Sequence, residues 1–549
     1  MNEELVPTSA TPRWASERGS LRATGAQALI RATSRVDAWR AGLVATFVLA
    51  VAVRARHVLL AGSPVNDGGM FAAMSEDIQR AGYALPTFTT YNHADIPFAY
   101  PPLALYLAAI VDDLTPLSMQ DVYWLLPLIG ASLAVVAFYA LARTCFTDRL
   151  TVLLATAAFA LTPRAFEWLV MGGGLTRGLG IAAALAALAA FRGGVEHRSR
   201  RAIGLAAVLA AVTLLSHMEA AVFLASGVAL TALERRDRWT LGAWAVAATG
   251  AMVLAAPWWA TVLARHGLEP FLASAEHGGS LVASGRAPLW VWQTVIDPVF
   301  TAEPFFSFVG ALGAFGALLA LAHGRWMLPA WWALIIVFHM RSFATFTVVP
   351  TALLAALVVV EVGIPAAREV IRRAPSQRAG RGRIALVAGA AVAVMLYGAV
   401  EPNRGEARLL RPVSEGDQIA MQWIAIRTPE DARFLVIPER EWFGDREGEW
   451  FPVLAQRESL GTPQGLEWVG GAFEDRAALH ARARSCASQH ADCLEALAED
   501  APFTFVYLPA GCCAPLRNSL RDDDRYVARY LGSAAVFERV ADAAGEVGR

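Results

Sequence analysis

The sequence predicts a polytopic α-helical membrane protein with about eleven transmembrane helices and a C-terminal extracytoplasmic α/β domain. Hydrophobic residues make up 56% of the 549 residues and charged residues only 17%, against roughly 25% in an average soluble domain. The mean hydropathy is +0.42, and the apolar runs fill residues 41–400, whereas residues 401–549 have a soluble composition. This distribution excludes a disordered chain and an ordinary cytosolic enzyme. The net charge of −1 argues against a nucleic-acid partner.

Eleven apolar runs are expected to cross the membrane. Residues 1–40 are polar and rich in arginine, without a cleavable signal pattern, so the first run is an uncleaved span that follows a cytoplasmic tail. Several runs are shorter than the ~20 residues that a full span needs. The runs lie at 41–61, 122–145, 150–164, 175–191, 202–216, 217–233, 240–263, 304–323, 326–340, 343–361 and 384–400.

The arginines orient these spans, because short cytoplasmic loops carry the excess positive charge. The basic loops are Arg192–Arg201, Arg235–Arg238 and Arg368–Arg383. Placing them inside puts the first loop, residues 62–121, and residues 401–549 outside the cytoplasmic membrane. The apolar run Tyr100–Val111 would invert every later loop if it crossed, so we expect a juxtamembrane or re-entrant helix there.

In this orientation most other ionisable residues of the membrane half lie at the outer face. Charged groups near the bilayer are costly, which makes them functional candidates. They are Asp67, Glu76, Asp77, His93, Asp95, Glu167, His217, Glu219, His266, Glu269, His277, Arg286, Asp297, Glu303, His339 and Arg341.

The strongest local motif follows the first span. Met70, Met74 and Ile78 recur every four residues and predict an amphipathic helix on the membrane surface. Asp67 precedes this helix, where the positive helix terminus favours an ionised carboxylate. The alternative role for Asp67 is a helix N-cap.

An arginine at the end of the first span (Arg54 or Arg56), an acidic residue ahead of a surface helix, Tyr100-Pro101-Pro102-Leu103 and a many-span body together resemble the GT-C glycosyltransferases. These membrane enzymes use polyprenyl-phosphate-linked sugars and include protein mannosyltransferases, lipid A aminoarabinose transferases and oligosaccharyltransferase catalytic subunits. The resemblance covers residues 40–400. Many members carry Asp-Glu where this chain has Asp67-Gly68, so only the aspartate carries over.

The resemblance implies an inverting transfer in which Asp67 is the general base that deprotonates an acceptor hydroxyl. The leaving phosphate or pyrophosphate needs fixed positive charge, which the planar guanidinium of arginine matches. Arg341 is the first candidate, Arg54 and Arg56 are the second, and Arg177 is the third. Arg54 and Arg56 could equally reach to the membrane interface. The backbone amides of Gly172–Gly174 are a further anion site, or this run is a flexible turn.

His217 and Glu219 are expected at the outer apex of a helical hairpin, where they would orient the acceptor. Glu76, Asp77, His93 and Tyr100 are further acceptor-binding candidates. With Asp67, the carboxylate and imidazole could instead hold a divalent cation, as in the oligosaccharyltransferase branch. The dense acidic motif of that branch is absent, so we expect no essential metal.

Residues 401–549 predict a small α/β domain. The expected strands are Arg433–Ile437, Phe503–Leu508 and Ala535–Val540, and the expected helices are 414–426 and 475–498. The stretch Glu449–Trp468 is rich in aromatic and turn residues. It either stacks on an acceptor sugar or packs the domain against the membrane body.

Four of the five cysteines lie in this region, namely Cys486, Cys493, Cys512 and Cys513, and Cys145 lies at a span end. An even number in an external domain favours disulfides, with three connectivities open. A zinc site is the rival, but the spacing is not the usual one.

The predicted function is sugar transfer from a polyprenyl-phosphate donor to a glycan, lipid or protein acceptor at the outer membrane face. The alternative is a non-catalytic polytopic protein, either a lipid-linked glycan transporter or a scaffold with an external sensing domain. Motifs for nucleotide binding are missing from the sequence, so ATP-driven transport has no support.

Overall fold

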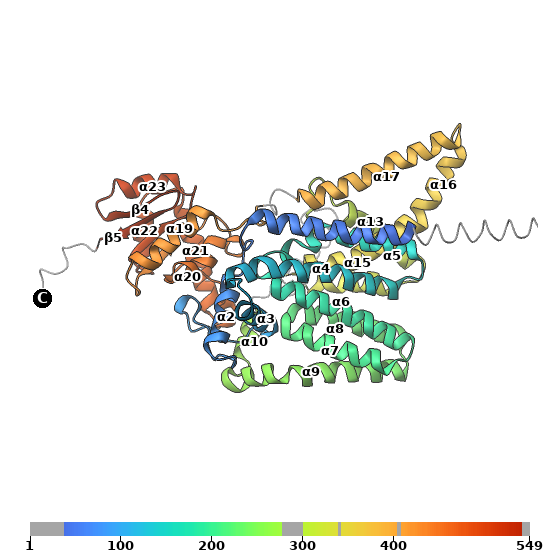
Figure 1. Ribbon diagram of the computed structural model, residues 1–549, viewed down its shortest axis with the longest axis horizontal. Helices are drawn as coiled ribbons and strands as arrows, with labels where there is room; N and C mark the ends of the chain where they lie inside the picture. The colour runs from blue at the N-terminus through green and yellow to red at the C-terminus, as the bar shows by residue number, and fades with distance from the viewer. Residues whose placement is uncertain (1–37, 277–299, 339–341, 403–407, 541–549) are drawn as a thin grey trace, which may run out of the picture.

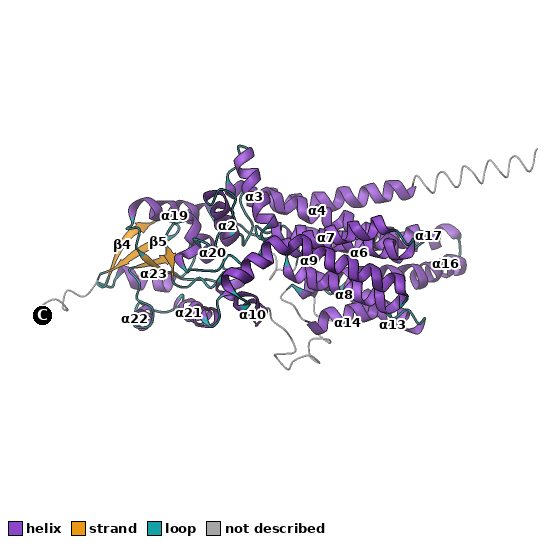
Figure 2. Cartoon of the chain, turned by 90° about the horizontal axis from the view of Figure 1, so that it is seen from below, coloured by secondary structure: helices purple, strands orange, loops and turns teal. Residues whose placement is uncertain are grey.

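The computed structural model describes residues 38–276, 300–338, 342–402 and 408–540. A bundle of long helices forms one end of the molecule, called here the helical body, and a smaller part with a β-sheet forms the other, the C-terminal region (residues 408–540) (Figure 1). The strands lie at the end away from the long helices (Figure 2). Short helices α2, α3 and α10 lie at the junction (Figure 1).

Each of the eleven predicted runs coincides with a helix of the body. Asp148, Ser199 and Asp237 start three of these helices, because their side-chain oxygens accept amide N–H groups of the first turn. The helices are Ala38–Ala61, α4 (Met119–Cys145), α5 (Arg149–Leu161), α6 (Gly174–Glu196), α7 (Arg200–Ser216), α8 (Met218–Arg235), α9 (Arg238–His266), α13 (Phe308–Ala322), α14 (Met327–Phe338), α15 (Phe343–Val358) and α17 (Gln377–Val400).

Six helical segments of the described chain are long and apolar enough to cross a membrane, or seven if the bent pair Arg149–Leu161 and Pro163–Leu169 is one span. The chain is therefore a membrane protein with at least six candidate spans, and eleven crossings stay a prediction. Continuing from α15, a π-helical turn at Val359–Gly363 and α16 (Ile364–Arg373) lead toward α17. Aliphatic side chains make up most of the core of the body, and stacked aromatic rings lie within it, with Phe223 lying 4.9 Å from both Trp331 and Phe346.

The predicted surface helix is α2 (Gly69–Arg80). It does not lie on the membrane surface with one free face, because nine of its twelve residues are buried. It packs against α3 (Leu103–Leu114), α4 and α20 of the C-terminal region. The helix α3 lies where a juxtamembrane or re-entrant helix is expected at Tyr100–Val111. It has 12 residues and is too short to span a membrane. The short helix α10 is Glu269–Glu276.

The C-terminal region contains a five-stranded sheet of order β2-β1-β3-β5-β4. Strand β1 pairs in parallel with β2 and β3, and β5 pairs antiparallel with β3 and β4. The three predicted strands are present. The elements are α19 (Glu415–Arg427), β1 (Arg433–Val436), α20 (Arg446–Leu454), β2 (Glu458–Ser459), α21 (Ala472–Cys486), α22 (Asp492–Ala498), β3 (Phe505–Leu508), α23 (Ala514–Arg521), β4 (Tyr526–Leu531) and β5 (Ala535–Arg539).

The predicted helix 475–498 is two helices. The chain turns between α21 and α22, and the disulfide Cys486–Cys493 bridges that turn. The second disulfide joins Cys512 to Cys513, and Cys145 is a free thiol.

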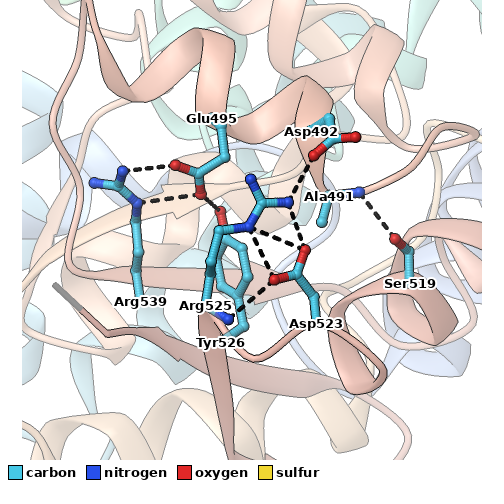
Figure 3. Close-up of polar contacts among 8 residues, drawn as sticks. All are labelled: Ala491, Asp492, Glu495, Ser519, Asp523, Arg525, Tyr526 and Arg539. Atoms are coloured by element: carbon cyan, nitrogen blue, oxygen red, sulfur yellow. Dashed lines mark hydrogen bonds and ion pairs between the residues drawn. The ribbon is translucent and has the colours of Figure 1, made fainter. Parts of the chain in front are cut away.

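A network of ion pairs links α22 to the neighbouring strands β4 and β5 (Figure 3). Arg525 pairs with Asp492 and with Asp523, each at 2.6 Å. Glu495 on α22 pairs with Arg539 at 2.6 Å and accepts a hydrogen bond from the Tyr526 hydroxyl. These contacts join α22, β4 and β5 into one unit.

Candidate functional site

A cavity of about 550 Å³ lies between the helical body and the C-terminal region. Aromatic, acidic and arginine side chains from both parts surround it. Its lining residues are Asp67, Met70, Phe71, Tyr100, Pro101, Arg164, Trp168, Arg177, His217, Met218, Glu219, Ser274, Phe300, Ser342, Phe343, Ala344, Thr345, Trp442, Phe443, Glu449, Gln464, Gly465, Glu467 and Trp468.

Asp67 is fixed at this cavity by two donors from the start of α6. Its Oδ1 accepts the Gly173 N–H at 3.0 Å, and its Oδ2 accepts from Arg177 Nη2 at 2.7 Å. The alternative N-cap role does not hold, because Gly68 occupies the N-cap position of α2 and no side chain caps that helix. The carboxylate therefore faces another element instead of its own helix.

The glycine run Gly172–Gly174 lies where the backbone closely approaches Asp67. A Cβ atom on Gly172 would lie 2.0 Å from the Asp67 carbonyl oxygen, and one on Gly173 would lie 2.9 Å from Asp67 Oδ2. Only glycine permits this approach. The Gly173 amide donates to the Asp67 carboxylate, and binding of a donor phosphate by this run stays a prediction.

Within the described part of the chain, two arginines line the cavity. Arg177 donates through Nε to the Trp168 carbonyl at 2.9 Å, and its guanidinium lies 5.5 Å from the Trp168 ring centre. Arg164 is 5% exposed and pairs with Glu167 at 3.8 Å. Sequence reasoning missed Arg164, although it stands at the outer end of the 150–164 run.

Neither Arg54 nor Arg56, the second pair of predicted phosphate-binding arginines, lines the cavity. Arg54 is buried in the first helix, where Nη1 donates to the carbonyl oxygens of Ala50 and Ala160 at 3.0 and 2.9 Å. Arg56 is exposed and pairs with Glu401 at 3.1 Å. Arg341, the first candidate, lies outside the described residues.

The predicted pair His217 and Glu219 lines the cavity at the start of α8. The Nδ1 of His217 accepts the Ala220 N–H at 3.3 Å, which caps the helix. Glu219 Oε2 accepts the Ser342 N–H at 3.0 Å and so links α8 to the start of α15.

Of the four first-loop candidates, only Tyr100 lines the cavity. Its hydroxyl lies 3.1 Å from Thr176 Oγ1, and its ring packs on Phe71 and Trp468. The others shape the loop instead. Asp77 is buried and accepts from Thr89 Oγ1 at 2.6 Å and Thr90 N–H at 2.9 Å, Glu76 pairs with Arg80 at 3.4 Å, and His93 is exposed in a turn.

Glu449 of α20 is the functional candidate that sequence reasoning did not single out by role. Its Oε1 accepts the Gly68 N–H at 2.8 Å. Burial and the adjacent Asp67 carboxylate raise the pKa of Glu449 to about 8. In the aromatic stretch around it, Trp450 is buried against the first loop and Trp468 lines the cavity. The stretch therefore packs the C-terminal region against the rest of the molecule, and stacking on an acceptor sugar stays a prediction.

The described residues do not fit a divalent cation. They contain no group of three or more His, Cys, Asp and Glu side chains arranged to hold a metal. Both oxygens of Asp67 already accept from nitrogen donors, and one oxygen of Glu219 does so too.

Comparisons with known proteins agree with this architecture. The family model described as dolichyl-phosphate-mannose-protein mannosyltransferase matches residues 99–260. ArnT from Cupriavidus metallidurans is 15% identical, with 93% of this chain and 99% of that chain covered and a TM-score of 0.52. No curated protein sequence matches the chain.

Two further solved structures are similar. Oligosaccharyltransferase AglB from Archaeoglobus fulgidus, in complex with an inhibitory peptide and a dolichol-phosphate, is 15% identical over 85% of this chain and 69% of that chain, with a TM-score of 0.51. Arabinofuranosyltransferase AftD from Mycobacteria is 14% identical over 92% of this chain and 40% of its own, with a TM-score of 0.53.

Proposed function

From the premise that this chain has the fold of the GT-C membrane glycosyltransferases, we propose that it is an inverting glycosyltransferase. It moves a sugar from a polyprenyl-phosphate-linked donor to an acceptor hydroxyl at the outer face of the cytoplasmic membrane. The observation that carries the proposal is the meeting of Asp67, Arg177 and Glu219 at one cavity beside the candidate spans.

In the proposed reaction, Asp67 takes the proton of the acceptor hydroxyl while that oxygen bonds to the anomeric carbon. The bond from the anomeric carbon to the phosphate oxygen breaks, and the phosphate leaves with its electron pair. Arg164 and Arg341 stabilise the negative charge on the leaving group, and Arg177 orients the Asp67 carboxylate through its hydrogen bond to Oδ2. His217, Glu219 and Tyr100 orient the acceptor.

The arginine-rich turns support an outward-facing cavity. Helices α6 and α8 both begin at the cavity, with Gly173 and His217 preceding them. Their far ends are joined by the ion pairs Arg192–Glu234 and Arg235–Glu196. Because arginine-rich turns stay cytoplasmic, we propose that residues 1–40 are inside, residues 41–400 form the membrane domain, and residues 401–549 are outside.

A donor screen with the purified protein in lipid nanodiscs tests the proposed function. Polyprenyl-phosphate and polyprenyl-pyrophosphate sugars are each supplied with glycan, lipid and peptide acceptors, and release of the lipid phosphate is followed. We expect transfer from at least one donor, with the anomeric configuration inverted in the product. Failure with every donor, or retained configuration, contradicts the proposal.

A further inference from the structure

The C-terminal region reaches the candidate base through two consecutive residues of α20. Glu449 Oε1 accepts the Gly68 N–H at 2.8 Å, and Trp450 Nε1 donates to the Asn66 carbonyl at 3.0 Å. The two residues on either side of Asp67 are therefore both held by α20. A Cβ atom on Gly69 would lie 2.6 Å from the Glu449 carbonyl oxygen, so the contact requires glycine there.

Asp67 and Glu449 differ in what stabilises their charge. Asp67 receives the Arg177 guanidinium and the Gly173 amide, whereas Glu449 receives only the Gly68 amide among the described residues. Of the two carboxylates, Glu449 thus has the fewer donors. Two adjacent carboxylates resist ionising together, so a shared proton belongs on Glu449, because burial raises the pKa of this carboxyl to about 8.

The charged and titratable groups around Glu449 support this assignment. Among its charged neighbours, Asp67 and Glu467 raise the pKa of Glu449, and Arg177 lowers it. The Tyr91 hydroxyl donates to the Glu449 backbone carbonyl. On the neighbouring α19, Asp417 accepts from the Tyr507 hydroxyl at 2.7 Å.

We propose that Glu449 works as a neutral carboxylic acid that donates its O–H to an oxygen of the acceptor beside the hydroxyl that Asp67 deprotonates. The proton stays on Glu449 throughout, so no bond to it forms or breaks. The proposal rests on the proposed function and makes the C-terminal region part of the acceptor site. It predicts that transfer is lost when Glu449 ionises.

The pH profile of kcat/KM for Glu449→Gln tests this role. Glutamine keeps the shape and the donor but cannot ionise. Wild type is expected to lose transfer above about pH 8, tenfold per pH unit, whereas Glu449→Gln stays within a few-fold of wild type at pH 7 and has no alkaline loss. A loss of about 100-fold at every pH, or an unchanged alkaline loss, overturns the proposal.

Glu447→Gln is the matched control. Glu447 lies on the same helix, burial raises its pKa to about 7, and it pairs with Arg446 at 2.8 Å. It does not line the cavity, so its replacement is expected to leave the alkaline loss of transfer in place.

A substrate-free measurement separates failure of this proposal from failure of the proposed function. The pKa of Glu449 is raised in the folded protein above its usual 4.5. Between pH 4.5 and about 8 the unfolded chain thus loses this proton first, so wild type loses stability relative to Glu449→Gln. The Tm of Glu449→Gln minus that of wild type should grow over this range and then stay constant. A pH-independent difference contradicts a neutral Glu449, even if no donor is ever turned over.

Discussion

The Asp67 carboxylate, which we propose as the general base, is held by two donors. The Arg177 guanidinium and the Gly173 amide both donate to it and fix its orientation. Loss of either donor is therefore expected to misplace the carboxylate relative to the acceptor hydroxyl.

Replacing Arg177 by glutamine should lower transfer by about 100-fold, the scale of losing one preorganised charged donor. The measurement is kcat/KM in nanodiscs. Arg192→Gln is the control, because Arg192 lies on the same helix but away from the cavity. It forms an ion pair with Glu234, with 3.9 Å between nitrogen and oxygen. Equal losses in the two variants would show that the effect is on helix α6 as a whole.

At the scale of elements, the site depends on how closely the start of α6 approaches the loop before α2. Asp67 and Gly173 are 106 positions apart in the sequence. Their contact needs a glycine-lined backbone at the point of approach. The positive end of α6 then adds to the charge of Arg177.

Gly173→Ala is expected to reduce transfer by at least about tenfold, because the added Cβ lies 2.9 Å from both Asp67 Oδ2 and the Phe71 ring and displaces the base. Gly193→Ala in the same helix meets nothing within 4 Å. It should keep full transfer and gain about 0.5–1 kcal/mol of stability from helix propensity. Full activity in Gly173→Ala would refute the need for close approach.

Local patterns predicted the elements well where burial alone decides them. The apolar runs became helices and three strongly apolar segments became strands. The helix α20 was missed because it has only nine residues and carries Pro452, and β2 because it has only two residues. The Glu449–Gly68 contact joins positions 381 apart, so no local pattern indicates it.

The site residues divide in the same way. Asp67, His217 and Glu219 flank helix starts, which a sequence can reveal, and the structure brings them to one cavity. Arg54 was chosen by its position at a span end, yet its partners are backbone carbonyls of α5 and its own helix. Arg164 also stands at the end of an apolar run. Only the packing of the helices decides that Arg164 lines the cavity and Arg54 does not.

At the scale of the whole molecule, the cavity exists because the C-terminal region docks on the first loop. Asn92 and Ser459 exchange two hydrogen bonds, at 2.9 and 2.7 Å. Asn66 N–H donates to the Arg411 carbonyl at 2.9 Å beside the bridge between Val65 and Pro412. The acidic and aromatic residues of the C-terminal region reach the cavity only in this docked arrangement.

Asn92→Gly tests the docking. Asn92 has a φ of 56°, which glycine also adopts, so the change removes only the side-chain bonds. We expect a loss of about 2 kcal/mol, from two bonds worth about 1 kcal/mol each, seen as a lower Tm, together with reduced transfer. Asn518→Ala, at an exposed position on α23, should change neither quantity, and an unchanged Asn92→Gly protein would contradict the docking account.

In the proposed reaction one carboxylate beside this cavity, that of Asp67, drives sugar transfer. Single-turnover transfer by Asp67→Asn, measured beside the exposed first-loop variant Asp95→Asn, tests this role. Asparagine keeps the shape but cannot take the proton, so we predict a loss of about 1,000-fold for Asp67→Asn and a wild-type rate for Asp95→Asn. An Asp67→Asn rate within threefold of wild type would contradict the account.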